Sequence, residues 1–312
     1  MTSDSQTSRG AGRLITPLIS PKQLVDIGFW NFRTMFPASK EEQIAEEFRR
    51  YRLEMLGISE ARWSGSGKTT LDTGEVVVWS GCESAHEKGV ALMMSNRAAK
   101  SLEEWKPISE RILIARFFSR YARLTVIVCY APTNLAEEDE EAFYLELQET
   151  VRNVNQHDVL IIGGDFNAKV GSDNRGFERC MGRFGLGEMN ENGLLLADFC
   201  QENGLVIGGT LFRHKEVHVY TWESPGGRAR NQIDHVLVSG KWRNSVQDVR
   251  TRRGEEVGSD HMLLILKLKL SLKAKKKNSP RKKFDTEKLK SQQVANQFKL
   301  AVSNRFQALE LV

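Results

Sequence analysis

The stretch that decides the fold is VLIIGGDFN, Val159 to Asn167, where an apolar run ends in two glycines, a carboxylate and an amide. A short, β-branched run closed by glycines is typical of a buried strand that delivers its last side chains to the rim of a sheet. Asp165 and Asn167 are two residues apart, so an extended backbone places both side chains on one face, where they can meet one small target such as a metal-bound phosphate. An ordinary polar turn is the alternative, because Gly, Asp and Asn are common turn residues.

Further strand and helix patterns lie on both sides of this run. Strands are predicted over residues 25–32, 53–59, 75–80, 89–95, 111–118, 123–130, 205–209, 218–222, 232–238 and 261–270. Helices are predicted to start at the Ser39 and Glu42 capping box and to cover 140–155 and 191–203. Strands joined by short links indicate hairpins beside βαβ crossovers, so the sheets should be mixed. The alternation of apolar residues and lysines after Ile265 predicts that the last strand lies at a sheet edge.

These elements predict an α/β fold. Many strands and helices that each bury one side favour two mixed β-sheets packed face to face and flanked by helices, a four-layer α-β-β-α sandwich. The 312 residues, 40% of them hydrophobic, can form a sizeable core. We expect a flexible leader over residues 1–23, a folded domain over 24–272, and a basic linker with a short helical tail over 273–312.

Cysteine spacing and hydropathy argue against other classes of protein. The four cysteines, Cys82, Cys129, Cys180 and Cys200, have no C-x-x-C spacing, which argues against a disulfide framework or a zinc site. No apolar run approaches the ~20 residues that span a bilayer, and residues 1–12 are polar instead of forming a signal core. We therefore expect a soluble, intracellular protein with no membrane partner.

The net charge of +5 is unevenly distributed along the chain. Residues 267–283 carry nine Lys and Arg and no acid, whereas residues 25–266 sum to about −7. An acidic body must attract nucleic acid through local basic patches and bound cations. One candidate patch is 228–253, with seven Lys and Arg; a solvated surface with scattered arginines is the alternative.

Six motifs follow one another along the chain: WNFRT (30–34), GISEARW (57–63), CYAPTN (129–134), GGDFNAKVG (163–171), NQIDHVLVS (231–239) and GSDHMLL (258–264). In this order and spacing they resemble the endonuclease/exonuclease/phosphatase superfamily. Within it, the chain is similar to the apurinic-endonuclease-like nuclease domain of RTE-type non-LTR retrotransposons. The resemblance implies the four-layer sandwich, with a site at one end where strand termini from both sheets meet.

Cleavage of a phosphodiester requires an activated water and neutralised phosphate charge, and Mg²⁺ with oxygen ligands is the natural agent, with Mn²⁺ as a substitute. Glu60, at a predicted strand end, is the expected principal ligand, and a surface glutamate is the other interpretation. The resemblance adds Asn31 and Asp260 to the metal site. Arg33 stands where apurinic endonucleases commonly have an acid, which argues against a second metal there. No small-molecule cofactor is expected.

The remaining catalytic candidates surround the reacting phosphate. Asp165 is expected to orient the attacking water or take its proton, and Asn167 to donate its amide to a phosphate oxygen. The resemblance implies that Tyr130 lies beside the scissile phosphate, with an aromatic core residue as the alternative. It also implies that Asp234 orients the imidazole of His261. Asp260 and His261 are adjacent, so they can share one site only if residues 259–260 form a turn.

Six residues are candidates for contact with DNA: Arg33, Thr133, Asn134, Trp222, Arg228 and Arg230. Arginine at position 33 fits the RTE-like pattern and a phosphate contact. Thr133 occupies the place where an asparagine often follows the proline, and Asn134 comes one residue later. Trp222 is a candidate for touching bases or sugars, with burial as the alternative.

Together these features predict a Mg²⁺-dependent DNA endonuclease that nicks one strand and leaves a 3′-hydroxyl, as the resemblance to retrotransposon nucleases implies. The Lys-rich run would add salt-sensitive affinity for DNA and serve as a nuclear localisation signal. Two alternatives stay open. One is a phosphatase or phosphodiesterase of the same fold that acts on lipid or RNA; the other is a catalytically silent, domesticated element that binds DNA.

Overall fold

The computed structural model describes residues 17–35, 38–83, 87–133, 137–253, 258–272 and 285–309. The chain divides into two compact units, Met1–Ser271 and Leu272–Val312. Across the described ranges, none of the helices has the length and apolar character that crossing a membrane requires. Residues 1–16 of the predicted leader and 273–284 of the predicted linker lie outside the described residues.

Seven strands form the first sheet, in the order β14-β15-β1-β2-β5-β4-β3. Their bounds are β1 Val25–Asn31, β2 Met55–Ser59, β3 Ser66–Thr70, β4 Val76–Ser80, β5 Val90–Met94, β14 Val246–Arg252 and β15 Leu263–Leu268. Strands β1 and β2 are parallel, and Asn31 pairs with Ser59 at their ends. Glu60 therefore leaves the sheet beside Asn31.

Six strands form the second sheet, in the order β10-β13-β9-β8-β7-β6. Their bounds are β6 Leu102–Ser109, β7 Ile112–Phe117, β8 Leu124–Tyr130, β9 Val159–Asp165, β10 Leu205–Ile207 and β13 Asp234–Ser239. Strands β8 and β9 are parallel, with Tyr130 opposite Asp165, and antiparallel β13 places Asp234 on the other side of Asp165. The register therefore aligns three candidate residues across the end of this sheet.

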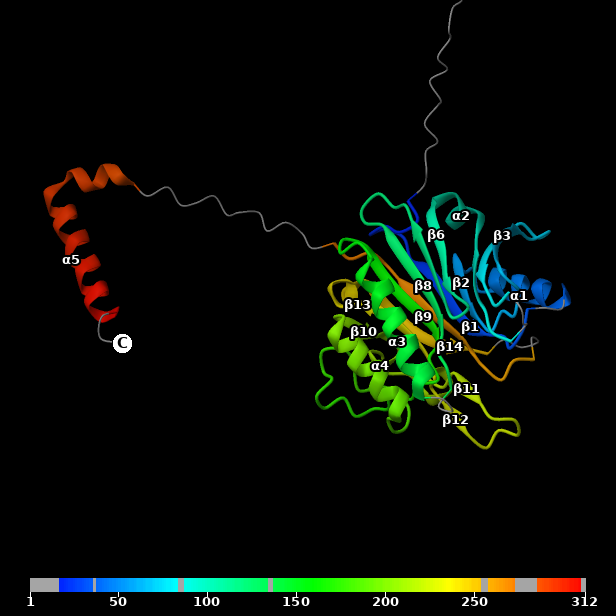
Figure 1. Ribbon diagram of the computed structural model, residues 1–312. Coiled ribbons are helices and arrows are strands. Elements are labelled where there is room, and N and C mark those ends of the chain that lie inside the picture. The colour runs from blue at the N-terminus through cyan, green and yellow to red at the C-terminus, as the bar shows by residue number, and fades with distance from the viewer. Residues whose placement is uncertain are drawn as a thin grey trace, which may run out of the picture. The chain divides into compact units, whose positions relative to one another are not determined.

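The two sheets pack face to face, and helices cover their outer faces (Figure 1). Phe29 of the first sheet and Ile161 of the second belong to the core cluster between them. Helix α1 (Ala38–Arg50) packs Ile44 and Phe48 on the outer face of the first sheet. Helices α3 (Glu137–Arg152) and α4 (Glu191–Glu202) cover the second sheet. The predicted α-β-β-α sandwich is confirmed.

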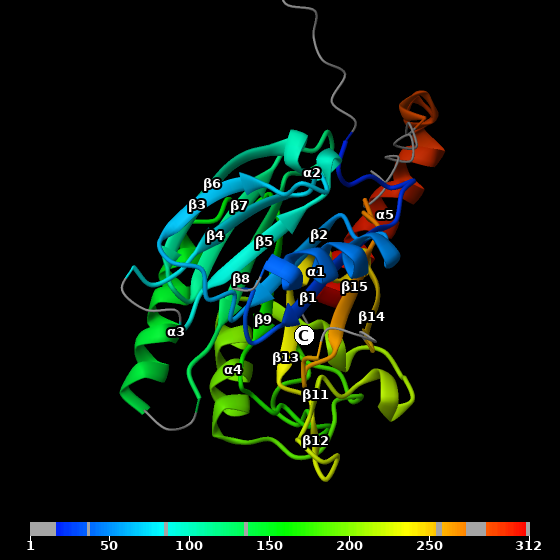
Figure 2. The same ribbon diagram turned by 90° about the vertical axis from the view of Figure 1, so that its right-hand side faces the viewer.

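Smaller elements complete both units. Helix α2 (Asn96–Ser101) connects β5 to β6. The short strands β11 (Trp222–Glu223) and β12 (Arg230–Asn231) form a hairpin at one end of the sandwich (Figure 2). In the second unit, a 3₁₀ turn, η4 (Thr286–Lys290), precedes helix α5 (Gln292–Leu309).

Several element predictions were wrong. Strand β15 lies between β14 and β1 and is not an edge strand; its Lys267 forms an ion pair with Asp26 on β1 at 3.1 Å, which explains how a lysine fits there. Residues 218–222 are not a strand, because the 3₁₀ turn Glu216–His218 comes first and β11 begins only at Trp222. Ser39 lies inside α1 rather than before it.

Other boundaries differ because tertiary packing outweighs local composition. Leu18 and Ile19 fall within the predicted leader but are buried in the core between the sheets. The polar strands β3 and β6 and the charged strand β14 were not predicted. The residues of β3 and β6 are mostly exposed, and β14 buries polar residues such as Asp248 and Thr251, so none of the three shows an apolar alternation from which to recognise a strand.

The glycine pair before Asp165 lets the strands approach one another closely. A Cβ atom on Gly163 would lie 2.5 Å from the ring of Phe29, so its absence allows β1 to pack against β9. Gly164 has a φ angle of +143°, and a Cβ atom there would lie 1.9 Å from the carbonyl oxygen of Cys129 on β8. These two positions require glycine if Asp165 is to reach its place at the strand end.

Gly164→Ala should lower the free energy of unfolding by about 3 kcal/mol or more, because the new Cβ meets backbone and the φ angle is unfavourable. Gly204→Ala is the matched control: Gly204 also has a positive φ angle, +60°, but nothing lies within 4 Å of a Cβ there. Its expected cost is about 1–2 kcal/mol. Urea unfolding curves measure both; equal losses in the two variants would contradict the proposed backbone clash.

Candidate active site

Strand ends from both sheets surround one pocket of about 320 Å³. The residues that line it are Arg33, Glu60, Tyr130, Thr133, Asp165, Asn167, Lys169, Asn190, Trp222, Asn231, Ile233, Asp260 and His261. Most of the residues singled out from the sequence are among them. Candidate residues from motifs that lie far apart in the sequence therefore lie close together at this end of the sandwich.

Asn31 is completely buried and joins the two sheets below the pocket. Its Nδ2 donates hydrogen bonds to Glu60 Oε1 and to Asp165 Oδ2, each at 2.9 Å. Its Oδ1 accepts the backbone N–H of Arg33 at 2.9 Å. Beside it, the Ser59 hydroxyl donates to the Cys129 carbonyl oxygen and accepts the Asp165 N–H. Polar contacts between the sheets therefore fix the positions of both carboxylates.

Asp165, Asp234 and His261 form a buried cluster, and each offers an atom within 4.8 Å of the others. His261 Nδ1 lies 3.0 Å from Asp234 Oδ2, and its Nε2 lies 4.0 Å from Asp165 Oδ2. Asp260 sits in a bend, and His261 makes a single bridge with Trp222 before β15 begins. The chain therefore bends at Asp260, as a site shared by Asp260 and His261 requires.

Burial and charge shift the proton affinities of this cluster. Burial alone would lower the pKa of His261, but Asp234 and Asp165 outweigh it and raise the pKa to about 9. Burial and Asp234 raise the pKa of Asp165, while His261 and the hydrogen bonds from Asn167 and Asn31 act to lower it. The imidazole is thus protonated at neutral pH. A protonated ring has no lone pair for a metal ion, so the cluster acts there as an ion-pair network.

Glu60 and Asp260 are each paired with an arginine. Arg62 Nη2 lies 2.9 Å from Glu60 Oε2, and Arg33 Nη2 lies 2.8 Å from Asp260 Oδ2. Trp222 Nε1 donates to the same Asp260 oxygen at 2.9 Å. The other oxygen, Asp260 Oδ1, is buried and has no hydrogen-bond partner within the described ranges. Leaving such an atom unsatisfied costs about 1–3 kcal/mol, which a ligand donor or cation would offset.

Tyr130 and Asn167 lie at the ends of β8 and β9. Burial, Glu60 and Asp165 raise the pKa of Tyr130, so its hydroxyl keeps its proton. Asn167 has a φ angle of +50°, its N–H donates to Asp165 Oδ1, and its Nδ2 donates to the Ala131 carbonyl oxygen at 3.0 Å. Because an amide nitrogen carries two hydrogens, the second can still meet a ligand.

Two of the predicted DNA-contact residues, Arg228 and Arg230, are not among the described residues that line the pocket. Arg228 and Arg230 belong to the exposed hairpin of β11 and β12, where Arg230 pairs with Glu223 and lies over the Tyr220 ring, 4.9 Å from its centroid. Asn134 lies outside the described residues. The hairpin presents both arginines to solvent, whereas the rest of the basic segment 228–253 continues into the largely buried strands β13 and β14.

Sequence reasoning missed several residues of the site. Lys169 and Asn190 line the pocket, and the Asn190 side chain accepts the N–H groups of Lys169 and Gly193 as the N-cap of α4. An asparagine just before a helical pattern is a readable capping signal for Asn190. Nothing in the local sequence distinguishes Lys169, or Arg62, from an ordinary surface cation.

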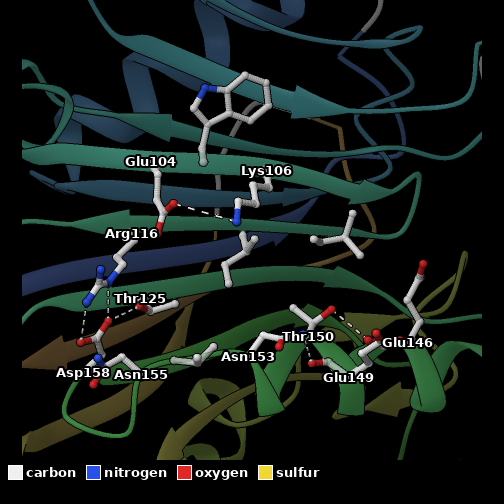
Figure 3. A pocket seen from close by; sticks show the side chains of 14 residues that line it. Glu104, Lys106, Arg116, Thr125, Glu146, Glu149, Thr150, Asn153, Asn155 and Asp158 are labelled. Atoms are coloured by element: carbon white, nitrogen blue, oxygen red, sulfur yellow. Dashed lines mark hydrogen bonds and ion pairs between the residues drawn. The ribbon is translucent and has the colours of Figure 1, made fainter.

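A second and larger cavity, of about 770 Å³, lies between β6, β7 and α3 (Figure 3). Glu104, Glu146, Glu149 and Asp158 line it, and Arg116 is paired with Asp158 at 2.7 Å. The described residues that line this cavity include none of those that the sequence motifs singled out for catalysis, metal binding or DNA contact. The smaller pocket at the strand ends is therefore the candidate active site.

Solved nuclease structures share the fold. The endonuclease domain of TRAS1, a telomere-specific non-LTR retrotransposon, is 17% identical with a TM-score of 0.57, covering 80% of this chain and 99% of that one. The AP endonuclease LMAP from Leishmania major is 13% identical with a TM-score of 0.59, covering 82% and 93%. The 3′-5′ exonuclease NExo from Neisseria meningitidis is 18% identical with a TM-score of 0.57, covering 78% and 100%. The fold is thus that of a class of α/β sandwiches that includes nucleases.

Sequence similarity identifies the family of the chain as well as its fold. Residues 29–261 match the Endonuclease/Exonuclease/phosphatase family, and the chain belongs to that family. Craniofacial development protein 2 from Bos taurus is 43% identical over 248 residues, which are 79% of this chain and 41% of that protein. The protein of the same name from Tragulus javanicus is also 43% identical over 248 residues, 79% of this chain and 42% of that protein. The chain spans about two fifths of the length of these relatives. The predicted family is confirmed.

Asp234→Asn should lower the pKa of His261 in the cation-free protein from about 9 to its ordinary 6.5 or below. Burial lowers this pKa, and the Asp234 carboxylate that raises it would be gone. NMR titration of the imidazole measures this. Because the folded-state pKa is raised, the wild-type protein gains stability from this proton below pH 6.5 and loses it as the pH rises through about 9. The Asp234→Asn variant should not show this loss of stability with rising pH. An imidazole pKa still near 9 in the variant would contradict the pairing of His261 with Asp234.

Proposed function

We propose that the chain is a Mg²⁺-dependent DNA endonuclease that hydrolyses one phosphodiester of a duplex and leaves a 3′-hydroxyl. The observation that carries this proposal is the gathering of Glu60, Asp165, Asp260 and His261, from both sheets, around one pocket. Membership of a family of nucleases and phosphatases supports phosphoester chemistry. The retrotransposon-like GISEARW and NQIDHVLVS motifs favour DNA over lipid or RNA.

The residues of the pocket fit a hard divalent cation. Glu60 and Asp260 offer carboxylate oxygens, which Mg²⁺ prefers, and the partnerless Asp260 Oδ1 is the kind of atom that a cation would satisfy. Asn31 would support the site by holding Glu60 through its amide. Mn²⁺ accepts the same ligands. A bound Mg²⁺ would neutralise charge on the phosphate and stabilise the leaving oxygen.

The buried cluster would supply the proton chemistry. Asp165, whose pKa is raised, would accept a proton from the attacking water as the water oxygen bonds to phosphorus and the P–O3′ bond breaks, and the leaving O3′ would take a proton from solvent. Asp234 holds His261 Nδ1 at 3.0 Å, which leaves the Nε2–H free to donate to a phosphate oxygen. A positively charged imidazole there would stabilise the negative charge that develops on the phosphate.

Other pocket residues would hold the phosphate and the DNA backbone. Tyr130 and Asn167 would donate hydrogen bonds to phosphate oxygens from the ends of β8 and β9. Thr133 lines the same pocket and is a candidate for a further contact, as is Asn134 from the sequence motif. These polar groups give orientation, which supplies a large part of catalysis in phosphoryl transfer.

The duplex would lie across the pocket toward the hairpin of β11 and β12. Arg33 at the rim and Arg228 and Arg230 on the hairpin are exposed cations suited to phosphates. Trp222 lines the pocket and is partly exposed, so its indole can meet a sugar or base while its Nε1–H stays on Asp260. Local cations of this kind offset the acidic charge of the domain.

The basic run near the C-terminus would add sequence-independent affinity and direct the protein to the nucleus. We place the folded nuclease domain at residues 24–272, with Leu18 and Ile19 packed into its core, and the basic linker and helical tail after it. This division also accounts for the opposite charges of the body and the linker.

Asp165→Ala and His261→Ala should each reduce Mg²⁺-dependent nicking of supercoiled plasmid by about 10²–10⁴-fold, because each removes a proton-transfer or charge-stabilising group. Gel assays with and without EDTA measure the rate. Asp198→Ala on α4 and His157→Ala are the matched controls, since both residues are exposed, and their rates should equal that of the wild type. Undiminished nicking by either active-site variant would refute the assigned roles.

The same preparations should be tested on phosphoinositide, sphingomyelin and RNA substrates. The proposal expects plasmid to be the preferred substrate. Preference for a lipid phosphate or RNA would instead assign another activity of the same fold. Metal-independent DNA binding with no turnover of any substrate would indicate a silent DNA-binding protein.

Replacing Lys275, Lys276 and Lys277 by glutamine should weaken DNA binding at low salt and flatten its salt dependence. Each phosphate contact that is lost makes the slope of log K against log salt shallower by about 0.9, so the change should reach up to about 3 units. Fluorescence anisotropy across a salt series measures the slope, with the nicking rate at saturating DNA as the control. An unchanged slope would show that these lysines do not contact DNA.

A further inference from the structure

Two arginines lie just beyond the ends of the parallel strands β1 and β2, two residues after the end of β1 and three residues after the end of β2. Arg33 comes two residues after Asn31, and Arg62 comes two residues after Glu60. Both have left-handed backbones, with φ angles of +61° and +57°. Glu60 between them has φ of +53°. Positive φ angles cost non-glycine residues roughly 1–3 kcal/mol and persist where the surrounding structure requires them, often at functional sites.

This backbone geometry brings both guanidinium groups back onto the carboxylates of the pocket. Arg33 pairs with Asp260 at 2.8 Å, and Arg62 pairs with Glu60 at 2.9 Å. The arginine side chains are 57% and 38% exposed, whereas the carboxylates they contact are only 12% and 14% exposed. Arg33 lines the pocket, and Arg62 reaches the pocket carboxylate Glu60 from outside the set of lining residues.

We propose that Arg33 and Arg62 form a clamp that exchanges partners: they neutralise Asp260 and Glu60 in the cation-free protein and move to DNA phosphates once a divalent cation binds. This inference rests on the proposed function, because it takes these two carboxylates as the cation ligands. It goes beyond that function by making cation binding and DNA binding mutually dependent through two named residues.

The charges of the pocket favour this exchange. A guanidinium and a divalent cation compete for the negative charge of the same carboxylate group. Once displaced, an exposed guanidinium can present its planar fork to a phosphate in two parallel hydrogen bonds. A cation should therefore strengthen DNA binding, and by thermodynamic reciprocity DNA should strengthen cation binding by the same factor.

The first test is Mn²⁺ binding to the full chain without DNA. In the double variant Arg33→Ala and Arg62→Ala, the dissociation constant of Mn²⁺ should fall roughly tenfold, because two competing positive charges are gone. The variant with lysine at both positions keeps the charges and should stay near the wild-type value. Arg52→Ala is the matched control: Arg52 has a φ angle of +53° but lies before β2, at its other end. Unchanged or weaker Mn²⁺ binding by the double alanine variant would overturn the proposal.

The second test is binding of a short labelled duplex in Ca²⁺, which takes the same kind of oxygen ligands, and in EDTA. Adding Ca²⁺ should raise the DNA affinity of the double alanine variant less than that of the wild type. The difference should be about the factor by which the same variant gains Mn²⁺ affinity in the first test. In Arg52→Ala the effect of Ca²⁺ should equal that in the wild type. An undiminished gain would overturn the proposal. If the predicted Mn²⁺ shift occurs but the wild type nicks no DNA, the clamp stands and the nuclease assignment fails. If the wild type nicks DNA but the Mn²⁺ shift is absent, the nuclease assignment stands and the clamp proposal fails.

Discussion

One buried amide determines how the rest of this site is arranged. Asn31 belongs to the first sheet, yet its Nδ2 donates to Asp165 at the end of the second sheet as well as to Glu60 beside it. The core between the two sheets consists mainly of apolar side chains, which set the spacing of the sheets but not the positions of polar groups. The amide and the neighbouring Ser59 hydroxyl supply that positional information, because hydrogen bonds depend on direction. Two carboxylates from different sheets are thereby held next to one pocket.

The same end of the molecule concentrates negative charge, and the structure compensates it in two ways. Inside, Asp165 and Asp234 share the protonated imidazole of His261. At the rim, Arg33 and Arg62 pair with Asp260 and Glu60. The inner cluster of Asp165, Asp234 and His261 is buried. The two outer arginine–carboxylate pairs are partly exposed. Only the outer arginines are placed to leave their carboxylates to a metal ion and to bind a phosphate instead without rearranging the core.

The sequence predicted those parts of the fold and site in which local pattern and global structure agree. The VLIIGG run predicted β9 and its position before Asp165, and the motif order predicted which residues would meet. Predictions failed where a neighbour decides the conformation. Lys267 gave β15 the appearance of an edge strand, although its ammonium group is accommodated by Asp26 on the next strand. The arginine pairs could not be foreseen, because they depend on left-handed backbone at Arg33 and Arg62 that no residue type signals.

We propose that strand ends of both sheets build a single cation-dependent hydrolytic centre. The most direct test is a crystal structure of the full chain soaked with Mn²⁺, with the ion located by its anomalous scattering. The account predicts one dominant peak in contact with carboxylate oxygens of Glu60 and Asp260. A peak elsewhere, such as in the acidic cavity between β6 and α3, or no peak at saturating Mn²⁺, would contradict it.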